Sequence, residues 1–234
     1  MNIPDDPDFI NDLILQRTGP FIRLGGGQAL NHWFETGEKA RLASFLKKQN
    51  LLPAYLKMLV FDVEREVETF CQHTTECSFN SLVSIGPGNG IFELMLCLRY
   101  NFERILLIDI EHTEGLHQHG FSTKGSGYAS LSRTKSFMSS NGIQQEKIVL
   151  CNPLKEKLPP FQFDILISLL SMGFHYPCND YTDFILSNLK PNSFVIFDKR
   201  KGVNDIGFEA LVRKLTIKQA VDGPKSNKYF LINR

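Results

Sequence analysis

Three glycines stand at alternate positions near the middle of the chain, and their spacing suits the binding of a phosphorylated or nucleoside ligand. Gly86, Gly88 and Gly90 directly follow an apolar run over residues 81–85, and a helical apolar pattern begins at Ile91. A strand, a tight glycine turn and a helix form the first unit of a nucleotide-binding α/β domain. Glycine lets the backbone turn sharply and lets a ligand approach where a side chain would collide. An ordinary glycine-rich turn without a ligand is the alternative interpretation.

A carboxylate lies near the end of the next predicted strand, over residues 104–110. This residue is Asp109, and its side chain can accept both ribose hydroxyls of a nucleoside seated on the glycine loop. Glu111 is the second choice for the same role. A solvated acid at a strand end is the alternative for Asp109.

The elements that would position these side chains alternate between strands and helices from residue 80 onward. The predicted strands are 81–85, 104–110, 147–151, 164–169 and 193–198, with helices at 91–99, before 141–142, at 180–189 and at 206–215. Two final β runs, 216–221 and 228–232, are joined by a turn containing Asp222, Gly223 and Pro224. This order predicts a doubly wound, mostly parallel, seven-stranded α/β sheet with a C-terminal antiparallel hairpin.

The first third of the chain has a different pattern, which predicts helices. A short helix over 9–17, a loop at 25–27 and helices over 31–49 and 53–71 are expected from the apolar spacing. We therefore expect residues 1–79 to form a helical extension or lid, and residues 80–234 to form the ligand-binding domain.

The loop spacing and the element order resemble those of class I (Rossmann-like) S-adenosylmethionine (SAM)-dependent methyltransferases. A dinucleotide fingerprint would have its third glycine where Ile91 stands, whereas Gly-x-Gly-x-Gly is the loop of this family. Five βα units and a closing hairpin are the family's order. The resemblance implies SAM as cofactor, and it implies these cofactor-binding residues: Ser84, Gly86, Pro87, Gly88, Asn89, Gly90, Asp109, Ile110, Asn152, Ser168 and Leu169.

The resemblance also gives some of these positions particular roles. Asp109 matches the family's acidic residue that holds the ribose, and Asn152 stands where an acidic or amide residue contacts the adenine amino group. A turn-forming Asn-Pro is the alternative for Asn152. Ser84 stands two residues before the first glycine, where the family usually has an acidic residue, so the loop offers no carboxylate there for the cofactor's amino group.

The segment after the fourth strand, residues 168–176, is expected to face the reacting methyl group and its acceptor. His175 falls about where many small-molecule methyltransferases carry a histidine. Because a hydroxyl acceptor must lose a proton, a histidine with an ordinary pKa near ~6.5 suits a general base. Substrate contact and a structural role are the alternatives for His175. Tyr176, Trp33 and Tyr128 are weaker candidates for the acceptor pocket.

A histidine-rich segment lies between the second and third strands. His112, His117 and His119 could bind a metal, but no further Cys or His pair completes a set at zinc-site spacing. A solvated loop is the favoured interpretation, and we expect no metal.

Composition limits the classes of partner. The 234 residues carry a formal net charge of +1, which gives no global field that would recruit nucleic acid or an anionic membrane. Five cysteines without a CxxC pair indicate a reducing, cytoplasmic compartment. No signal peptide or membrane span is expected. A homodimer through the helical extension stays open.

These observations predict a SAM-dependent methyltransferase that moves a methyl group to a hydroxyl of a small molecule or glycan. The first alternative is a catalytically inactive methyltransferase-like binding module that acts with a protein partner. An NAD(P)-dependent oxidoreductase is disfavoured by Ile91 and by the closing hairpin. A nucleic-acid methyltransferase is disfavoured because residues 168–171, Ser-Leu-Leu-Ser, replace the Asn/Asp-Pro-Pro-Tyr/Phe tetrapeptide of nucleobase amino-methyltransferases.

Overall fold

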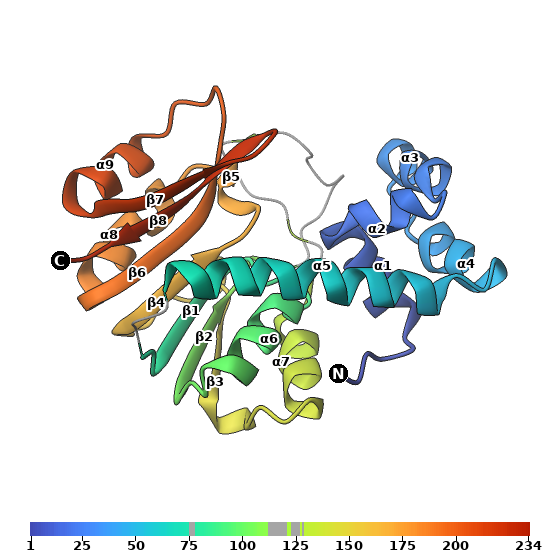
Figure 1. Cartoon of the computed structure of the whole chain (residues 1–234), viewed down its shortest axis with the longest axis horizontal. Helices are drawn as coiled ribbons and strands as arrows, with labels where there is room; N and C mark the ends of the chain where they lie inside the picture. The colour runs from blue at the N-terminus through green and yellow to red at the C-terminus, as the bar shows by residue number, and fades with distance from the viewer. Residues whose placement is uncertain (75–77, 112–120, 123–126, 128) are drawn as a thin grey trace.

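The apolar runs of the second half of the chain form the strands of one sheet (Figure 1). This computed structural model describes residues 1–74, 78–111, 121–122, 127 and 129–234. The strands of the sheet are β1 (Ser81–Ile85), β2 (Arg104–Ile108), β3 (Ile148–Cys151), β4 (Phe163–Ser168), β6 (Leu189–Arg200), β7 (Thr216–Asp222) and β8 (Ser226–Ile232).

The strand order is β3-β2-β1-β4-β6-β8-β7. Every neighbouring pair is parallel except the two pairs that contain β8, which runs antiparallel to β6 and to β7. The predicted fold class, a mostly parallel seven-stranded sheet with an antiparallel C-terminal hairpin, is therefore confirmed.

Alternating side chains of the strands divide the core into two layers. In β1, Leu82 belongs to one cluster of buried apolar residues, while Val83 and Ile85 belong to the other. The first cluster includes side chains of helices α5 (Leu52–His73), α6 (Ile91–Arg99) and α7 (Leu131–Ser140). The second includes side chains of α8 (Asn179–Asn188) and α9 (Ile206–Lys214). Helices on both faces make the sheet doubly wound.

The N-terminal region is helical, as expected, but its helices differ from the prediction. They are α1 (Pro7–Gln16), α2 (Thr18–Arg23), α3 (Gly27–Thr36), α4 (Ala40–Lys48) and α5. The single helix predicted over 31–49 is wrong, because Gly37 adopts a left-handed φ of 75° and its N–H bonds the Trp33 carbonyl, which ends α3. Helix α2 was not predicted.

A second difference lies after β4. Residues 171–176 were given no element in the prediction, and they form strand β5 (Ser171–Tyr176), which lies against β6. A short 3₁₀ helix, Gln145–Lys147, precedes β3.

The N-terminal helices share a core with the sheet. One continuous cluster of buried apolar side chains contains Phe21 and Tyr55 from these helices, Phe92 from α6 and Phe194 from β6. In Figure 1, α5 crosses in front of the sheet and α1–α4 group beyond its end. The boundary at residue 79 stays a prediction.

Within the described part of the chain, no helix is both long enough and apolar enough to cross a membrane.

Candidate functional site

A cavity of about 510 Å³ is lined by the segments that directly follow β1, β2 and β4. Its walls include Gly86 and Gly88 after β1, Asp109 after β2 and Leu169 after β4. Strand β1 lies between β2 and β4, so the chain winds to one side of β1 first and later to the other. In open α/β sheets, ligands bind outside the carboxyl ends of the strands at such a switch point.

The glycine loop requires glycine for its backbone and for close packing. Gly86, Gly88 and Gly90 have φ values of 71°, 56° and 73°, which L side chains rarely adopt. A Cβ atom on Gly86 would collide with Ser171, and one on Gly88 would collide with the side chain of Gln16. The glycines were predicted to be needed for the approach of a ligand. In the structure, the protein's own side chains approach these two glycines.

Helix α1 holds the glycine loop by hydrogen bonds. Gln16 donates from Nε2 to the Pro87 carbonyl at 2.9 Å and accepts the Asn89 backbone N–H at 3.1 Å. Asn89 donates from Nδ2 to the carbonyl of Phe9 at 2.9 Å. Pro87 and Asn89 were predicted to bind the cofactor. They do not line the cavity, and these bonds connect them to α1 instead.

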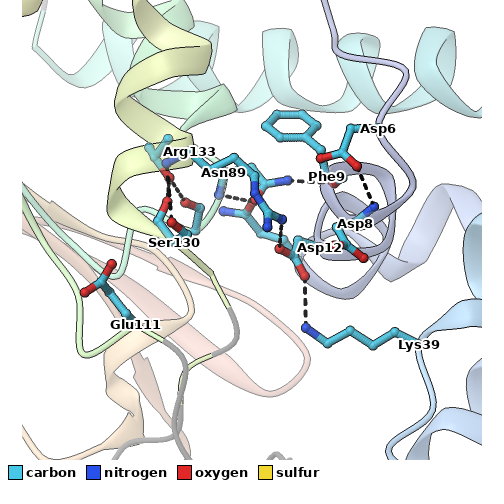
Figure 2. Close-up of polar contacts among 12 residues, drawn as sticks. Asp6, Asp8, Phe9, Asp12, Lys39, Asn89, Glu111, Ser130 and Arg133 are labelled. Carbon is cyan, nitrogen blue, oxygen red and sulfur yellow. Dashed lines mark hydrogen bonds and ion pairs between the residues drawn. The ribbon is translucent and has the colours of Figure 1, made fainter.

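An ion-pair cluster fixes α1 to helix α7. Asp12 is 3% exposed, and its carboxylate lies 3.0 Å from Lys39 Nζ and 3.0 Å from Arg133 Nη1. Figure 2 shows Asp12 between these two cations, with Asn89 and Phe9 nearby. Because Arg133 belongs to α7, this cluster ties α1 to a helix that packs on the sheet.

Asp109 is placed beside the glycine loop. Burial raises the pKa of its carboxyl to about 6, while the backbone N–H groups of Glu111 and Gly88 oppose this rise. The Glu111 N–H donates to Asp109 Oδ1 at 2.7 Å. Above this pKa the carboxylate is an acceptor at the cavity wall, which fits the hydroxyl donors of a ribose.

Ser84 and a carboxylate missed in the sequence analysis form a buried pair. Ser84 is 1% exposed and donates from Oγ to Glu93 Oε1 at 2.7 Å. Glu93 is 4% exposed, is the third residue of α6 and lines the cavity. Burial raises the pKa of Glu93 to about 7, and the Ser84 hydroxyl opposes this rise. A lone acid within the apolar run 91–98 was the signal that could have revealed it.

Arg17, between α1 and α2, is a second lining residue that the sequence analysis missed. Its Nη1 lies 2.6 Å from Glu66 Oε2, and Glu66 Oε1 lies 3.4 Å from Lys228 Nζ. Lys228 also lies 2.9 Å from Asp198. Burial lowers the pKa of Arg17, but Glu66 and the charges of Glu93 and Asp198 outweigh this and raise it, so the guanidinium stays charged.

The segment after β4 reaches the cavity with some of its predicted residues. Leu169, His175 and Tyr176 line the cavity. Ser168 does not, because it is fully buried and donates to the Ile85 carbonyl at 2.9 Å. Burial raises the pKa of Tyr176 well above its ordinary value, so its phenol is neutral at physiological pH. The His175 ring meets Phe174 edge-on, with centroids 4.9 Å apart.

Aromatic side chains of α3 complete the cavity on the helical side. Trp33, predicted for the acceptor pocket, lines the cavity together with Phe34, and their ring centroids lie 5.1 Å apart. Tyr128, predicted for the same pocket, lies outside the described residues.

Asn152 is not among the residues that line the cavity, and its amide is already bonded. Its Nδ2 donates to Glu111 Oε2 at 2.9 Å and to the Ile110 carbonyl at 3.2 Å, and its Oδ1 accepts the Leu154 N–H at 3.0 Å. The bond from the Leu154 N–H is the local one expected of the alternative interpretation, a turn-forming Asn-Pro, while the other two bonds connect Asn152 to the segment after β2. Contact with adenine stays a prediction.

The structure therefore separates the predicted residues into two groups. Those at the cavity are Gly86, Gly88, Asp109, Ile110, Leu169, His175, Tyr176 and Trp33. Those not among its lining residues are Ser84, Pro87, Asn89, Gly90, Asn152 and Ser168. The cofactor role of each stays a prediction.

The three histidines considered as metal ligands, His112, His117 and His119, lie outside the described residues. Among the residues that are described, no group of three or more His, Cys, Asp or Glu side chains is arranged to hold a metal ion.

Comparison with known proteins shows the fold. No protein-family model and no curated protein sequence matches the chain. Among solved structures, the N-methyltransferase NodS from Bradyrhizobium japonicum WM9, in complex with S-adenosyl-L-homocysteine, is similar, with a TM-score of 0.52 and 13% identity over 73% of this chain and 86% of that one. StiE O-MT (residues 942–1257) is similar over 72% of this chain and 74% of that one, with a TM-score of 0.52 and 9% identity. The chain thus has the fold of class I methyltransferases.

Proposed function

We propose that this chain is a SAM-dependent methyltransferase. The observation that carries the proposal is the meeting of the glycine loop and Asp109 in one cavity at the switch point of this sheet. The fold supports it, because NodS and StiE O-MT, which share it, are methyltransferases by name and NodS was solved with S-adenosyl-L-homocysteine.

The residues at the cavity fit the cofactor. Asp109 would accept the ribose hydroxyls beside Gly88, and the free carboxylate oxygen of Glu93 suits a cationic group. SAM supplies an electrophilic methyl carbon on a sulfonium sulfur, which keeps the bonding electrons when the methyl leaves. The protein then contributes proximity and orientation, which are the main requirements of such a displacement.

We propose a hydroxyl of a small molecule or glycan as the acceptor, with His175 as general base. His175 would take the proton that the acceptor hydroxyl loses as its oxygen bonds the methyl carbon. Its place at the cavity wall supports this role, and Trp33, Phe34 and Phe174 offer apolar surfaces on which a ring could pack. Because NodS is an N-methyltransferase and StiE is named O-MT, the shared fold does not determine whether the acceptor atom is nitrogen or oxygen.

Calorimetric titration with S-adenosyl-L-homocysteine (SAH), SAM and NAD tests the cofactor. Micromolar binding of the first two without binding of NAD supports the proposal. Binding of none of the three contradicts it and favours a methyltransferase-like module that acts with a protein partner.

The base role is tested separately, once a screen of hydroxylated metabolites and glycans has found an acceptor. In His175→Ala, SAH affinity should change little while turnover falls by about 100-fold or more, because general bases contribute about 10²–10⁴ to rates. Unchanged turnover, measured as SAH released at saturating SAM, would remove this role from His175.

A further inference from the structure

Two buried polar atoms of opposite charge lack partners in the same cavity. In the described part of the chain, Arg17 Nε and Glu93 Oε2 are buried and have no hydrogen-bond partner. Both residues line the cavity that holds the glycine loop and Asp109. The charges of the two side chains interact, since Arg17 lowers the pKa of Glu93 and Glu93 raises the pKa of Arg17.

Each of these groups is held in place through another of its polar atoms. Glu93 Oε1 accepts the Ser84 hydroxyl, and Arg17 Nη1 pairs with Glu66 at 2.6 Å. Buried polar atoms are nearly always hydrogen-bonded, because leaving one unpaired costs about 1–3 kcal/mol, and more for a charge. Two such atoms at one cavity indicate that a ligand satisfies them.

The chemistry of the missing ligand follows from the two charges. A carboxylate oxygen requires a donor, best a cation, and a guanidinium N–H requires an acceptor, best an anion. The group that presents an ammonium and a carboxylate on one carbon is the α-amino acid group. We propose that Glu93 and Arg17 together bind the α-amino acid end of the ligand, Glu93 its ammonium and Arg17 its carboxylate.

This inference rests on the proposed function for the ligand's identity, which is then the methionine portion of SAM. Glu93, on helix α6, would then supply the carboxylate that is missing before the glycine loop, where Ser84 stands. The Ser84 hydroxyl would orient this carboxylate. Arg17 would also give the N-terminal helices a share in the cofactor site. The neighbouring residue, Gln16, already bonds the glycine loop from the same helix end.

The test uses three ligands that divide the cofactor into its parts. SAH contains the nucleoside and the amino acid, 5′-methylthioadenosine contains only the nucleoside, and L-methionine contains only the amino acid. Calorimetry on the full chain compares the unmodified protein with Glu93→Gln and Arg17→Lys. The lysine keeps a cation beside Glu66 but loses the guanidinium Nε. Glu68→Gln, an exposed change on α5, is the matched control.

We expect both variants to bind SAH at least tenfold more weakly and 5′-methylthioadenosine within twofold of the unmodified protein. The control should bind both ligands normally. Unchanged SAH affinity overturns the inference, and so does an equal loss for both ligands, which would mark a structural role.

Other outcomes separate this inference from the proposed function. If SAH and 5′-methylthioadenosine both bind and the variants lose neither, the cofactor proposal stands and the assignment of Arg17 and Glu93 fails. If neither nucleoside ligand binds but L-methionine does, and Glu93→Gln abolishes this, the amino acid site stands and the cofactor proposal fails. If L-methionine binds the SAH complex as well, the amino acid group belongs to an acceptor, which overturns the assignment to the cofactor.

Discussion

The two walls of the cavity are built in different ways. On the sheet wall, β1 and β2 pair in parallel register with Ile85 opposite Ile108, so the glycine loop and Asp109 emerge side by side from one hydrogen-bonded ladder. On the helical wall, Arg17 and Trp33 come from the N-terminal helices, far away in the sequence. Side-chain contacts join this wall to the sheet wall, among them Gln16 with the glycine loop and Asp12 with Arg133.

This difference between the walls indicates which part of the protein would hold each half of the ligand. A strand ladder fixes its loops through many backbone hydrogen bonds, whereas a polar side-chain contact contributes only about 0.5–1.5 kcal/mol. The sheet wall should therefore determine whether a nucleoside binds at all. The helical wall, through Arg17, should determine together with Glu93 of α6 how tightly the rest of the ligand is held.

Replacing Asp109 should have the largest effect, and it should weaken every nucleoside ligand. Asp109→Ala removes the acceptor for two ribose hydroxyls, and hydrogen bonds to a charged group contribute about 1.5–3 kcal/mol each. We expect losses on the order of 100-fold for SAH and for 5′-methylthioadenosine alike, measured by calorimetry. Asp109→Asn, which keeps the shape and one acceptor oxygen, should lose less.

If Asp109→Ala instead weakens SAH by less than about threefold, the ribose is held elsewhere. The sheet wall would then not be the nucleoside side of the cavity.

Replacing Glu93 should stabilise the ligand-free protein while it weakens SAH binding. Burial raises the pKa of Glu93 from its ordinary value of 4.5 to about 7. Between these values the folded protein binds a proton more tightly than the unfolded chain, so stability falls as pH rises through this range and stays low above it. Glu93→Gln should therefore be more stable than the unmodified protein at pH 8, by at most about 3 kcal/mol, and little different at pH 4.5.

Urea denaturation without ligand at both pH values measures this difference. The same stability difference at pH 4.5 and pH 8 would contradict a raised pKa for the buried Glu93 carboxyl. Glu93 would then have only a structural role in α6.

The sheet wall was largely predictable from the sequence because its signals are local. The apolar run that forms β1, the glycines after it and Asp109 after β2 are read from neighbouring residues. The strands lie within a few residues of their predicted bounds, the largest difference being β6, which begins at Leu189 instead of residue 193. The reason for the glycines was not local, however. The side chains that leave no room for a Cβ atom at positions 86 and 88 are Ser171 and Gln16, which are distant in the sequence.

The helical wall was much less predictable because its roles arise only in the folded chain. The helical character of the N-terminal region was confirmed, but the break at Gly37 depends on a left-handed residue that an apolar pattern does not reveal. Arg17 shows no motif, and its partner Glu66, on α5, comes beside it only in the folded chain. Glu93 does not belong to this wall, since it lies on α6 directly after the glycine loop, and it did carry a local signal as the one acid in an apolar helix.

The smallest effect expected is that of Gln16, and it tests whether the two walls are coupled. Gln16→Ala removes two hydrogen bonds to the glycine loop, so we expect a loss of about 1–2 kcal/mol in unfolding free energy. Because the loop is what shifts, SAH and 5′-methylthioadenosine should weaken equally, by a few fold, unlike the selective loss predicted for Arg17→Lys. Hydrogen exchange should speed up at the Asn89 amide, which loses its acceptor, while Gln28→Ala, an exposed change on α3, should leave all three measurements unchanged. An unaltered Asn89 exchange rate would mean that the sheet wall holds its loop without help from α1, and the two walls would then act independently.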